Sequence, residues 1–339
     1  MMPSSHPTIR DVAKQAGVSH QTVSRVINGS EDVLPETRAL VEAAIQDMRY
    51  RPSAIARSMA RGQTHTLACI SPNLTDYTFA SVIEGAEMEA RKHNYFLLSS
   101  SATDPEAFRE LVDELIGHRR VDGLIVINPY SDQRFEYVPQ NFPLVFVGAQ
   151  SHEKNISSVC LDDEKVAYEA AYHLISLGYL NIAMVTGPME EDCSRDRTEG
   201  YRRALHEAGI AFDESMVIEG DWSATSGQSA LLSLVEQGRV PTAVFAQNDR
   251  MALGVLRAAR NINLKVPSQL AVIGVDDMPL SSYFDPPLTT MRQDMPRIGQ
   301  EATRMLLDMI QKKNTDLREV KLPAQLIVRQ STSDKGGGQ

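Results

Sequence analysis

Residues 8–29 read TIRDVAKQAGVSHQTVSRVING, and this stretch predicts two short helices joined by a tight turn. Thr8 followed by Asp11 is typical of a capping box, in which each side chain bonds the other residue's backbone amide at a helix N-terminus. Apolar residues then recur at the spacing that gives a helix one buried face, namely Val12, Ala13 and Ala16. Gly17 is expected to end this first helix.

The second helix is predicted to start after Ser19, a natural N-cap residue, and to run from His20 to about Asn28. Its inward positions are apolar, and they are Val23, Val26 and Ile27. The outward side chains are His20, Gln21, Ser24 and Arg25. Gln21 and Arg25 are four residues apart, so they project from one face. Such a pair is typical of a helix-turn-helix unit, which places its second helix in the major groove of DNA.

The outward residues carry the chemistry that base reading needs. A Gln amide can pair with the N6/N7 edge of adenine and an Arg fork with the O6/N7 edge of guanine, each contributing about 1 to 3 kcal/mol of discrimination. Short polar side chains near the helix N-terminus suit phosphate oxygens, which fix register without reading sequence. The expected backbone contacts are Thr8, Ser19, Thr22, Ser24 and Asn28. The alternative is an ordinary helical pair with a solvated polar face, and the complete string with Gly17 and Ser19 favours DNA.

Composition places the 339-residue chain among globular proteins of two or three domains, since 42% of it is hydrophobic and 23% charged. The net charge of −10 at first argues against nucleic acid, but the charge is unevenly divided. Residues 1–62 hold eight Lys or Arg against six Asp or Glu, and the remainder holds 26 against 38. A basic headpiece on an acidic body lets the headpiece approach phosphates. Its small excess predicts modest nonspecific affinity unless two headpieces act together.

Other classes of protein find little support in the sequence. Cys69, Cys160 and Cys193 are far apart and show no C-x-x-C spacing, so neither a disulfide framework nor a zinc site is predicted. The N-terminal MMPSSHPT lacks an apolar signal core, and no apolar run approaches 18 residues. We therefore expect a cytoplasmic protein with no cofactor and no membrane partner.

A third helix is expected from Pro35, with one apolar side formed by Leu40, Val41, Ala44, Ile45 and Met48. Pro52 stops it, and SAIARSMARG (53–62) has the length of about two helical turns. We expect a three-helix headpiece over 1–51 and a hinge helix with linker over 52–63.

From Leu67 onward, short apolar runs alternate with amphipathic segments. One set of buried strands is expected at 67–70, 96–98, 123–127 and 144–147, with helices near 79–93 and 106–118. A second set is expected at 182–185, 216–218, 243–245 and 270–275, with helices near 164–177, 195–209, 225–237 and 249–260. This alternation predicts an α/β fold with two doubly wound parallel-sheet subdomains facing each other across a cleft. Within 64–333 the expected division is 64–161 with 292–320 against 162–291 with 321–333, followed by a disordered tail at 334–339.

Ligands of such sheets lie beyond the carboxyl ends of the strands. The residues found there are Asn73, Asp76, Tyr77 and Phe79, then Arg195 and Arg197, then Trp222, Asn248, Asp249, Asp276 and Asp277. A guanidinium fork, an amide and a carboxylate beside an aromatic face suit a polyhydroxylated ligand, which offers hydroxyls and an apolar ring face.

Structural roles are the alternatives for these residues. Asn248 and Asp249 can cap the helix predicted to begin at Arg250. Arg197 can form a surface ion pair, and Trp222 can belong to the core. Packing is the favoured role for Tyr77, Phe79 and Met295.

The chain resembles the LacI/GalR family of bacterial transcription repressors from residue 8 to about 333, and its motifs are most similar to those of the repressor that gives the family its name. In VSHQTVSRVIN, the resemblance implies that His20, Gln21 and Arg25 read bases. His20 replaces a Tyr, which implies a related but different operator. The segment from Ser53 to Arg61 resembles the family's hinge helix, which pairs with its dimer mate in the minor groove. Met59 stands where the family inserts a leucine, and Ala56 lies on the same face.

In the body, GDWSATSG, VPTAVFAQNDRMALG and PPLTTMRQD resemble segments of the same repressor. The resemblance implies that Arg197, Asn248 and Asp276 bind effector hydroxyls and that Trp222 lines the pocket. Gly148 replaces an acidic pocket residue, and the loop with Asp76 and Tyr77 also departs from the pattern, so a galactoside is not implied. The chain ends in TSDKGGGQ without apolar heptads, which predicts a dimer.

These observations predict a homodimeric repressor that binds a pseudo-palindromic operator and responds to a sugar effector. Whether the effector releases DNA or strengthens binding stays open, with release implied by the resemblance. A solute-binding protein of a transport system is one rival, opposed by the headpiece and the missing export signal. An enzyme acting on sugars through Asp276 and Asp277 is another, opposed because adjacent strand residues point to opposite faces.

Overall fold

The computed structural model describes residues 7–51, 62–130, 134–148, 156–313 and 316–333. The chain divides into a headpiece unit, Met1–His65 with Arg119–Asp122, and a body unit, Thr66–His118 with Gly123–Gln339. The expected hinge residues Ser53, Ala56 and Met59 lie outside the described residues, as does the expected tail at 334–339.

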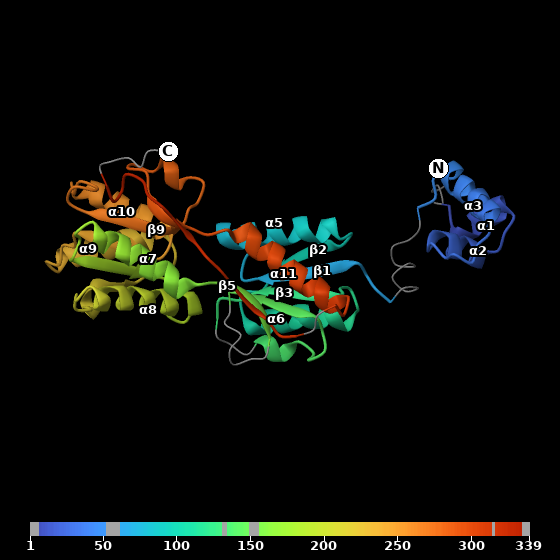
Figure 1. Ribbon diagram of the computed structural model, residues 1–339, viewed down its shortest axis with the longest axis horizontal. Coiled ribbons are helices and arrows are strands. Elements are labelled where there is room, and N and C mark those ends of the chain that lie inside the picture. Colours follow the sequence, from blue (N-terminus) through green and yellow to red (C-terminus); the bar gives the residue numbers. More distant parts are fainter. Residues whose placement is uncertain (1–6, 52–61, 131–133, 149–155, 314–315, 334–339) are drawn as a thin grey trace. The chain divides into compact units, whose positions relative to one another are not determined.

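The headpiece contains three helices, α1 (Ile9–Ala16), α2 (His20–Ile27) and α3 (Pro35–Asp47) (Figure 1). Both halves of the predicted capping box form between Thr8 and Asp11, and Ser19 caps α2 as predicted. Gly17 ends α1 with φ of 68°, a conformation that a Cβ disfavours. The headpiece core consists of Val12, Ala13, Val23, Val26, Val33, Val41 and Ala44.

One expectation for α3 was wrong. Leu40 is 59% exposed, whereas Val41 is fully buried. Consecutive helical positions are about 100° apart, so a face centred on Val41 and Ala44 turns Leu40 toward solvent.

The body contains two sheets, as the sequence predicted, but each has six strands where four were expected. The first subdomain has the strand order β11-β5-β4-β3-β1-β2, with all neighbours parallel. Its strands are β1 (Thr66–Ser71), β2 (Phe96–Ser101), β3 (Gly123–Ile127), β4 (Leu144–Val147), β5 (Ser157–Leu161) and β11 (Glu319–Leu322). Its helices are α5 (Tyr77–Lys92), α6 (Pro105–Val112) and α11 (Met295–Ile310), with a π-helical turn at Asp113–Gly117 and a 3-10 turn at Arg134–Tyr137.

The second subdomain has the order β12-β10-β9-β8-β6-β7, and only the edge pair β10–β12 is antiparallel. Its strands are β6 (Ile182–Thr186), β7 (Val217–Glu219), β8 (Ala243–Ala246), β9 (Ala271–Asp276), β10 (Thr289–Arg292) and β12 (Gln325–Ile327). Its helices are α7 (Asp163–Ser176), α8 (Asp192–Glu207), α9 (Ala224–Glu236) and α10 (Asp249–Asn261), with 3-10 turns at Glu214–Met216 and Ser281–Tyr283.

Helix α11 belongs to the first subdomain although it follows β10 of the second. Figure 1 shows it beside α5 over the first sheet. The two helices approach so closely that a Cβ on Gly85 would lie 2.0 Å from the carbonyl oxygen of Pro296. The chain thus crosses between subdomains after β5, β10 and β11, and all three crossings lie near the carboxyl ends of strands.

Three details of the expected body differ from the structure. The run 96–98 is not a buried strand, because β2 lies at a sheet edge and Phe96 is 79% exposed. Strands β5, β10, β11 and β12 and helix α11 were not predicted as elements. The expected divisions at 291/292 and 320/321 fall inside strands, since β10 runs to Arg292 and β11 to Leu322. In the described parts of the chain, no helix is long and apolar enough to cross a bilayer.

Candidate functional site

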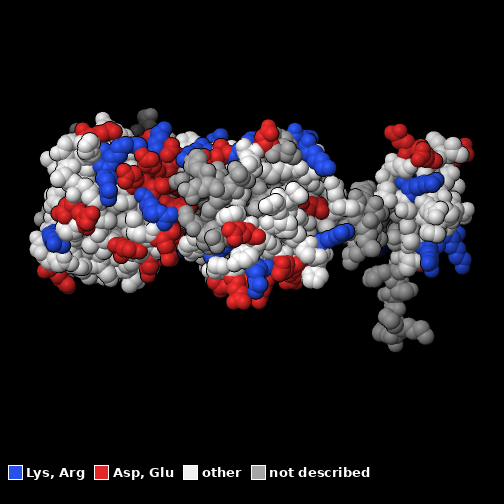
Figure 2. All heavy atoms as spheres, turned by 90° about the horizontal axis from the view of Figure 1, so that it is seen from below, with Lys and Arg blue, Asp and Glu red and all other residues white. Residues whose placement is uncertain are grey.

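The outer face of α2 presents the three residues expected to read bases. His20, Gln21 and Arg25 are exposed, and among the described residues their side chains form no hydrogen bond or ion pair. The opposite face is fixed by Val23 and Val26 in the headpiece core. On the headpiece face seen in Figure 2, Asp and Glu gather at the upper edge, and Lys and Arg lie just below them and at the lower edge. Three polar groups on a rigid, capped helix are free to meet a nucleobase edge.

The residues expected to contact the DNA backbone mostly support the helices. Thr8 Oγ1 lies 2.7 Å from Asp11 Oδ2, and Ser19 Oγ accepts from the Thr22 amide at 3.1 Å. Asn28 follows the last residue of α2, and its Nδ2 lies 3.4 Å from Ser24 Oγ. The hydroxyls of Thr8, Ser19 and Ser24 already bond to neighbouring residues of the headpiece. Any contact that they make with a DNA phosphate therefore comes in addition to this structural role.

A cavity of about 800 Å³, measured out to its mouth, lies at the carboxyl ends of the strands between the two subdomains. A cavity at the carboxyl ends of the strands is where folds of this kind bind small-molecule ligands. Of the six residues expected to bind an effector, five line it, namely Asp76, Arg197, Trp222, Asn248 and Asp276. Tyr77 does not, because it begins α5 and is 37% exposed. Gly148 also lines the cavity, as do Phe79 and Met295, for which packing was expected.

Arg197 forms a buried ion pair, not the surface pair considered as its alternative. Its Nε donates to Asp163 Oδ1 at 2.7 Å and its Nη1 to the Gln247 carbonyl at 2.5 Å. The guanidinium also lies 5.9 Å from the centre of the Trp222 ring. Burial raises the pKa of Asp163, and the nearby Arg197 opposes that rise.

Trp222 is half-buried with its ring against the backbone of Gly187. A Cβ at Gly187 would lie 2.0 Å from the Trp222 ring, so only glycine permits this approach. The indole Nε1 donates to Glu191 Oε1 at 3.0 Å. The ring is thereby fixed in the cavity wall, where it can stack on an apolar face of a ligand.

Asn248 is the N-cap of α10, which begins at Asp249. Its Oδ1 accepts from the Met251 amide at 2.8 Å, and its Nδ2 donates to the Trp222 carbonyl at 3.1 Å. Asn248 therefore combines the structural role considered for it with a place in the cavity wall.

Asp249 is not the cap that its position suggested. Its carboxylate is buried and accepts from Ser281 Oγ at 2.5 Å and Thr290 Oγ1 at 2.6 Å, and also from the Met278 amide. Burial raises the pKa of Asp249 to about 6. These bonds fix the loop that follows β9.

Asp276 ends β9 with φ of 118°, and it lines the cavity with no hydrogen bond or ion pair inside the described residues. Burial raises its pKa well above the usual range, and neighbouring Asp249 adds to the rise. Asp277 has different partners, because it pairs with Arg292 and Arg329, each at 2.6 Å. The two adjacent acids therefore do not share the cavity.

Several cavity residues escaped the sequence reasoning. Asp163 follows β5 directly, so recognition of that strand would have found it by the carboxyl-end rule. Glu191 follows β6 in the loop before α8, and Arg250 lies in the first turn of α10. Across the described ranges, no group of three or more His, Cys, Asp or Glu side chains is placed to hold a metal ion.

Comparison with known proteins agrees with this combination of headpiece and cavity. The family profile "Bacterial regulatory proteins, lacI family" matches residues 8–53, and the profile "Periplasmic binding protein-like domain" matches residues 171–332. Catabolite control protein A of Priestia megaterium is 37% identical over 96% of this chain and 99% of that protein. The HTH-type transcriptional repressor PurR of Proteus mirabilis (strain HI4320) is 34% identical over 96% of this chain and 97% of that protein.

Solved structures show the same likeness. The Lac repressor dimer bound to operator and the anti-inducer ONPF has a TM-score of 0.88 and 32% identity, covering 96% of this chain and 99% of that one. The complex of transcriptional regulator CelR with cellobiose has a TM-score of 0.73 and 30% identity, with the same coverage.

The headpiece and the ligand-binding body thus define a DNA-binding transcription regulator. The chain belongs to the LacI family of bacterial regulatory proteins.

Proposed function

We propose that this protein is a homodimeric repressor whose affinity for a pseudo-palindromic operator is controlled by a sugar or glycoside bound in the cavity. The observation that carries the proposal is the buried carboxyl of Asp276, which lines the cavity together with Arg197 and Trp222 and has no side-chain hydrogen bond or ion pair among the described residues. A buried polar group without a partner is costly, and a ligand hydroxyl supplies the missing partner. The CelR–cellobiose complex among the related structures supports a carbohydrate.

For DNA recognition, each headpiece is proposed to read one half-site through His20, Gln21 and Arg25. The Lac repressor structure with operator is a dimer, which supports two-fold symmetry here. Exposed apolar side chains offer a surface for the second copy, including Phe96 on β2 and Leu280 and Tyr283 after β9. Because bacterial DNA lies in the cytoplasm, we place the protein there.

For control by the effector, the walls of the cavity are the important feature. They come from both subdomains, so a bound ligand contacts both and stabilises one relative placement of them. If the operator favours another placement of the subdomains, the effector and the operator each weaken the binding of the other, typically by about 1 to 3 kcal/mol. Release of DNA by the effector is the direction that we propose.

We also propose that the protein has no enzymatic activity of its own. Asp277 is held by Arg292 and Arg329 and does not line the cavity, so the Asp276–Asp277 pair considered for a glycosidase does not form there. Incubation with glycosides is expected to yield no product.

Footprinting of host genomic fragments, with and without a panel of mono- and disaccharides, tests the function. A protected pseudo-palindromic tract that one sugar releases is expected. A thermal-shift screen identifies that sugar, because a ligand of the native state raises the melting temperature. The proposal fails if no tract is protected under any of these conditions.

A further inference from the structure

The charges in the cavity wall are unevenly compensated. The described lining holds four carboxyl groups but only two guanidinium groups. Each guanidinium already has a carboxylate partner. Arg250 Nη2 lies 2.5 Å from Asp76 Oδ2, and Arg197 Nε lies 2.7 Å from Asp163 Oδ1. Glu191 and Asp276 therefore form no ion pair within 4 Å among the described residues, although Arg197 lies near enough to interact with both.

Both remaining carboxyl groups are buried, each residue being 8% exposed. One oxygen of Glu191 accepts from the Trp222 indole, and the other meets only the Cys193 thiol, at 3.9 Å. The side chain of Asp276 forms no hydrogen bond in the described structure. Burial raises the pKa of Glu191 and of Asp276, which shows how poorly either charge is solvated.

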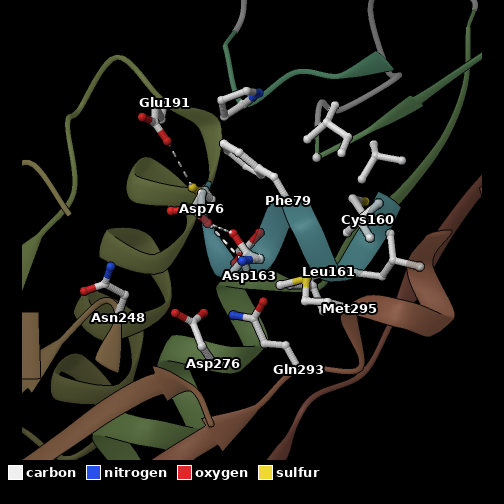
Figure 3. Close-up of a pocket in the computed structure, with 18 of the residues that line it drawn as sticks. Asp76, Phe79, Cys160, Leu161, Asp163, Glu191, Asn248, Asp276, Gln293 and Met295 are labelled. Atoms are coloured by element: carbon white, nitrogen blue, oxygen red, sulfur yellow. Dashed lines mark hydrogen bonds between the residues drawn. The ribbon is translucent and has the colours of Figure 1, made fainter. Parts of the chain in front are cut away.

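The opposite wall of the cavity is apolar. Figure 3 shows Glu191, Asn248 and Asp276 on one side and Cys160, Leu161 and Met295 on the other. Most residues of the second group belong to the first subdomain, and they offer a ligand contact area but no charge. The cavity thus has a hydrogen-bond-accepting side and an apolar side.

We propose that Glu191 and Asp276 together restrict the effector to molecules without negative charge, with hydroxyl or amino donors at one end and an apolar face at the other, and that Glu191 is a specificity-determining residue. This inference rests on the proposed function, because it concerns the ligand of the same cavity. Sugar phosphates and sugar acids are excluded.

The physical reason is the arrangement of charges. A phosphate or carboxylate loses its hydration in this cavity and finds no free cation there, because Arg197 and Arg250 are already neutralised by closer partners. Any ionised form of Glu191 or Asp276 adds repulsion. A hydroxyl donates to the free oxygen of Glu191, and a protonated amine also supplies the missing positive charge. In a matched series of ligands, the amino and uncharged sugars are therefore expected to bind more tightly than the corresponding phosphate or acid.

Trp222 makes the test direct. It is the only tryptophan of the chain and contacts Glu191 in the cavity wall, so its fluorescence reports ligands there. The full-length protein is titrated with hexoses and disaccharides and with their amino, 6-phosphate and uronic acid derivatives, and calorimetry checks each positive result. Binding by an uncharged or amino sugar, with no binding by its phosphate or acid, is expected.

The variant Glu191→Gln separates a specificity role from a structural one. Gln keeps an acceptor for the Trp222 indole but has no charge. In the Glu191→Gln variant, the ratio of the affinity for the amino sugar to the affinity for its uncharged parent is expected to fall about tenfold. This factor corresponds to the difference between a charged and a neutral hydrogen bond. A merely structural role weakens both ligands equally. Glu190→Gln is the matched control, because Glu190 is exposed and does not line the cavity.

Two results overturn the inference: tighter binding of a phosphate or acid than of its uncharged parent, or binding by no uncharged or amino member of the panel. An unchanged amino-to-parent ratio in Glu191→Gln removes the role of Glu191. If a sugar phosphate binds and releases the operator, the inference fails and the proposed function stands.

Discussion

Asp76 and Arg250 meet across the cavity, with 2.5 Å between Oδ2 and Nη2. Asp76 caps α5 of the first subdomain, and Arg250 lies in the first turn of α10 of the second. The pair therefore joins the two walls between which the proposed effector binds. An ion pair in this position favours the subdomain placement seen here over others.

We predict that Arg250→Gln changes effector response more than stability. Arg250 is partly exposed, so loss of the pair is expected to cost about 0.2 to 1 kcal/mol. Removal of a contact between the walls shifts the sugar concentration for half-release of the operator by about two- to fivefold. Fluorescence anisotropy of labelled operator measures this shift. An identical release curve, with the fold intact, shows that the pair has no part in the coupling.

Arg25→Ala is predicted to cost about 1 to 3 kcal/mol at the cognate operator and little on random DNA. The Arg25 side chain is exposed and unpaired in the described headpiece, so its removal leaves the headpiece core unchanged. Gel-shift titrations on both DNAs give the ratio. Arg10→Ala, at an exposed position of α1, serves as a control and is expected to leave the ratio unchanged. Equal losses on both DNAs for Arg25→Ala would remove the base-reading role.

Asp276→Asn is predicted to leave operator binding intact and to abolish the response to the effector. The Asp276 carboxyl lines the cavity and forms no hydrogen bond or ion pair with another described side chain, so its loss affects the ligand first. A loss of about 1.5 to 3 kcal/mol in sugar binding is expected for a hydrogen bond to a charged group. Calorimetry measures it, and normal sugar binding by the variant shows that the ligand lies elsewhere.

Tyr283→Asp is predicted to weaken the dimer. Tyr283 is 84% exposed in the single chain and lies close to Leu280, which is 63% exposed, and exposed apolar side chains that cluster mark interaction sites. Aromatic residues at the centre of an interface commonly contribute about 2 kcal/mol or more. Sedimentation velocity over a dilution series follows dissociation. Tyr172→Asp, at another exposed tyrosine, is the control, and equal behaviour of the two variants contradicts the proposed surface.

Protonation of Glu89 at low pH is predicted to lower the free energy of unfolding. Hydrogen bonds from Arg304 of α11 lower the pKa of this buried carboxyl on α5 from 4.5 to about 2. Because the folded pKa lies below the unfolded one, the contribution is full above pH 4.5 and is lost as the pH falls toward 2.

Glu89→Gln is accordingly expected to lose about 1.5 to 3 kcal/mol of unfolding free energy at pH 7 and to show a weaker acid dependence. Urea unfolding at several pH values measures both. The control is Glu87→Gln on the same helix, where the acid pairs with Arg91 and is more exposed. A Gln variant with the full acid dependence would assign the effect to other groups.

The headpiece was predictable because its determinants are local. The Thr8–Asp11 capping box, the turn at Gly17 and the cap at Ser19 each involve residues within a few positions of one another. The prediction for Leu40 was wrong because the buried face of α3 is narrow, and Val41 and Ala44 occupy it. The alternation of apolar runs with amphipathic segments predicted the two sheets. Short edge strands such as β11 and β12 contain too few apolar residues to be predicted in this way.

The cavity was predictable only in part. The rule that ligands lie at the carboxyl ends of strands placed Asp76, Arg197, Trp222, Asn248 and Asp276 around it, because each follows or ends a recognisable strand. The partners of these residues were not predictable. Arg250 reaches Asp76 from 174 positions away, and Glu191 reaches Trp222 from 31.

The sequence by itself determined the helix-turn-helix unit, the parallel α/β body and the set of polar residues at the strand ends, because caps, turns and periodicity depend on neighbours along the chain. Only the tertiary structure decided which charges are neutralised and which are not. That outcome depends on distances of a few ångströms between residues of different elements, and on burial, which removes the water that would otherwise solvate Glu191 and Asp276.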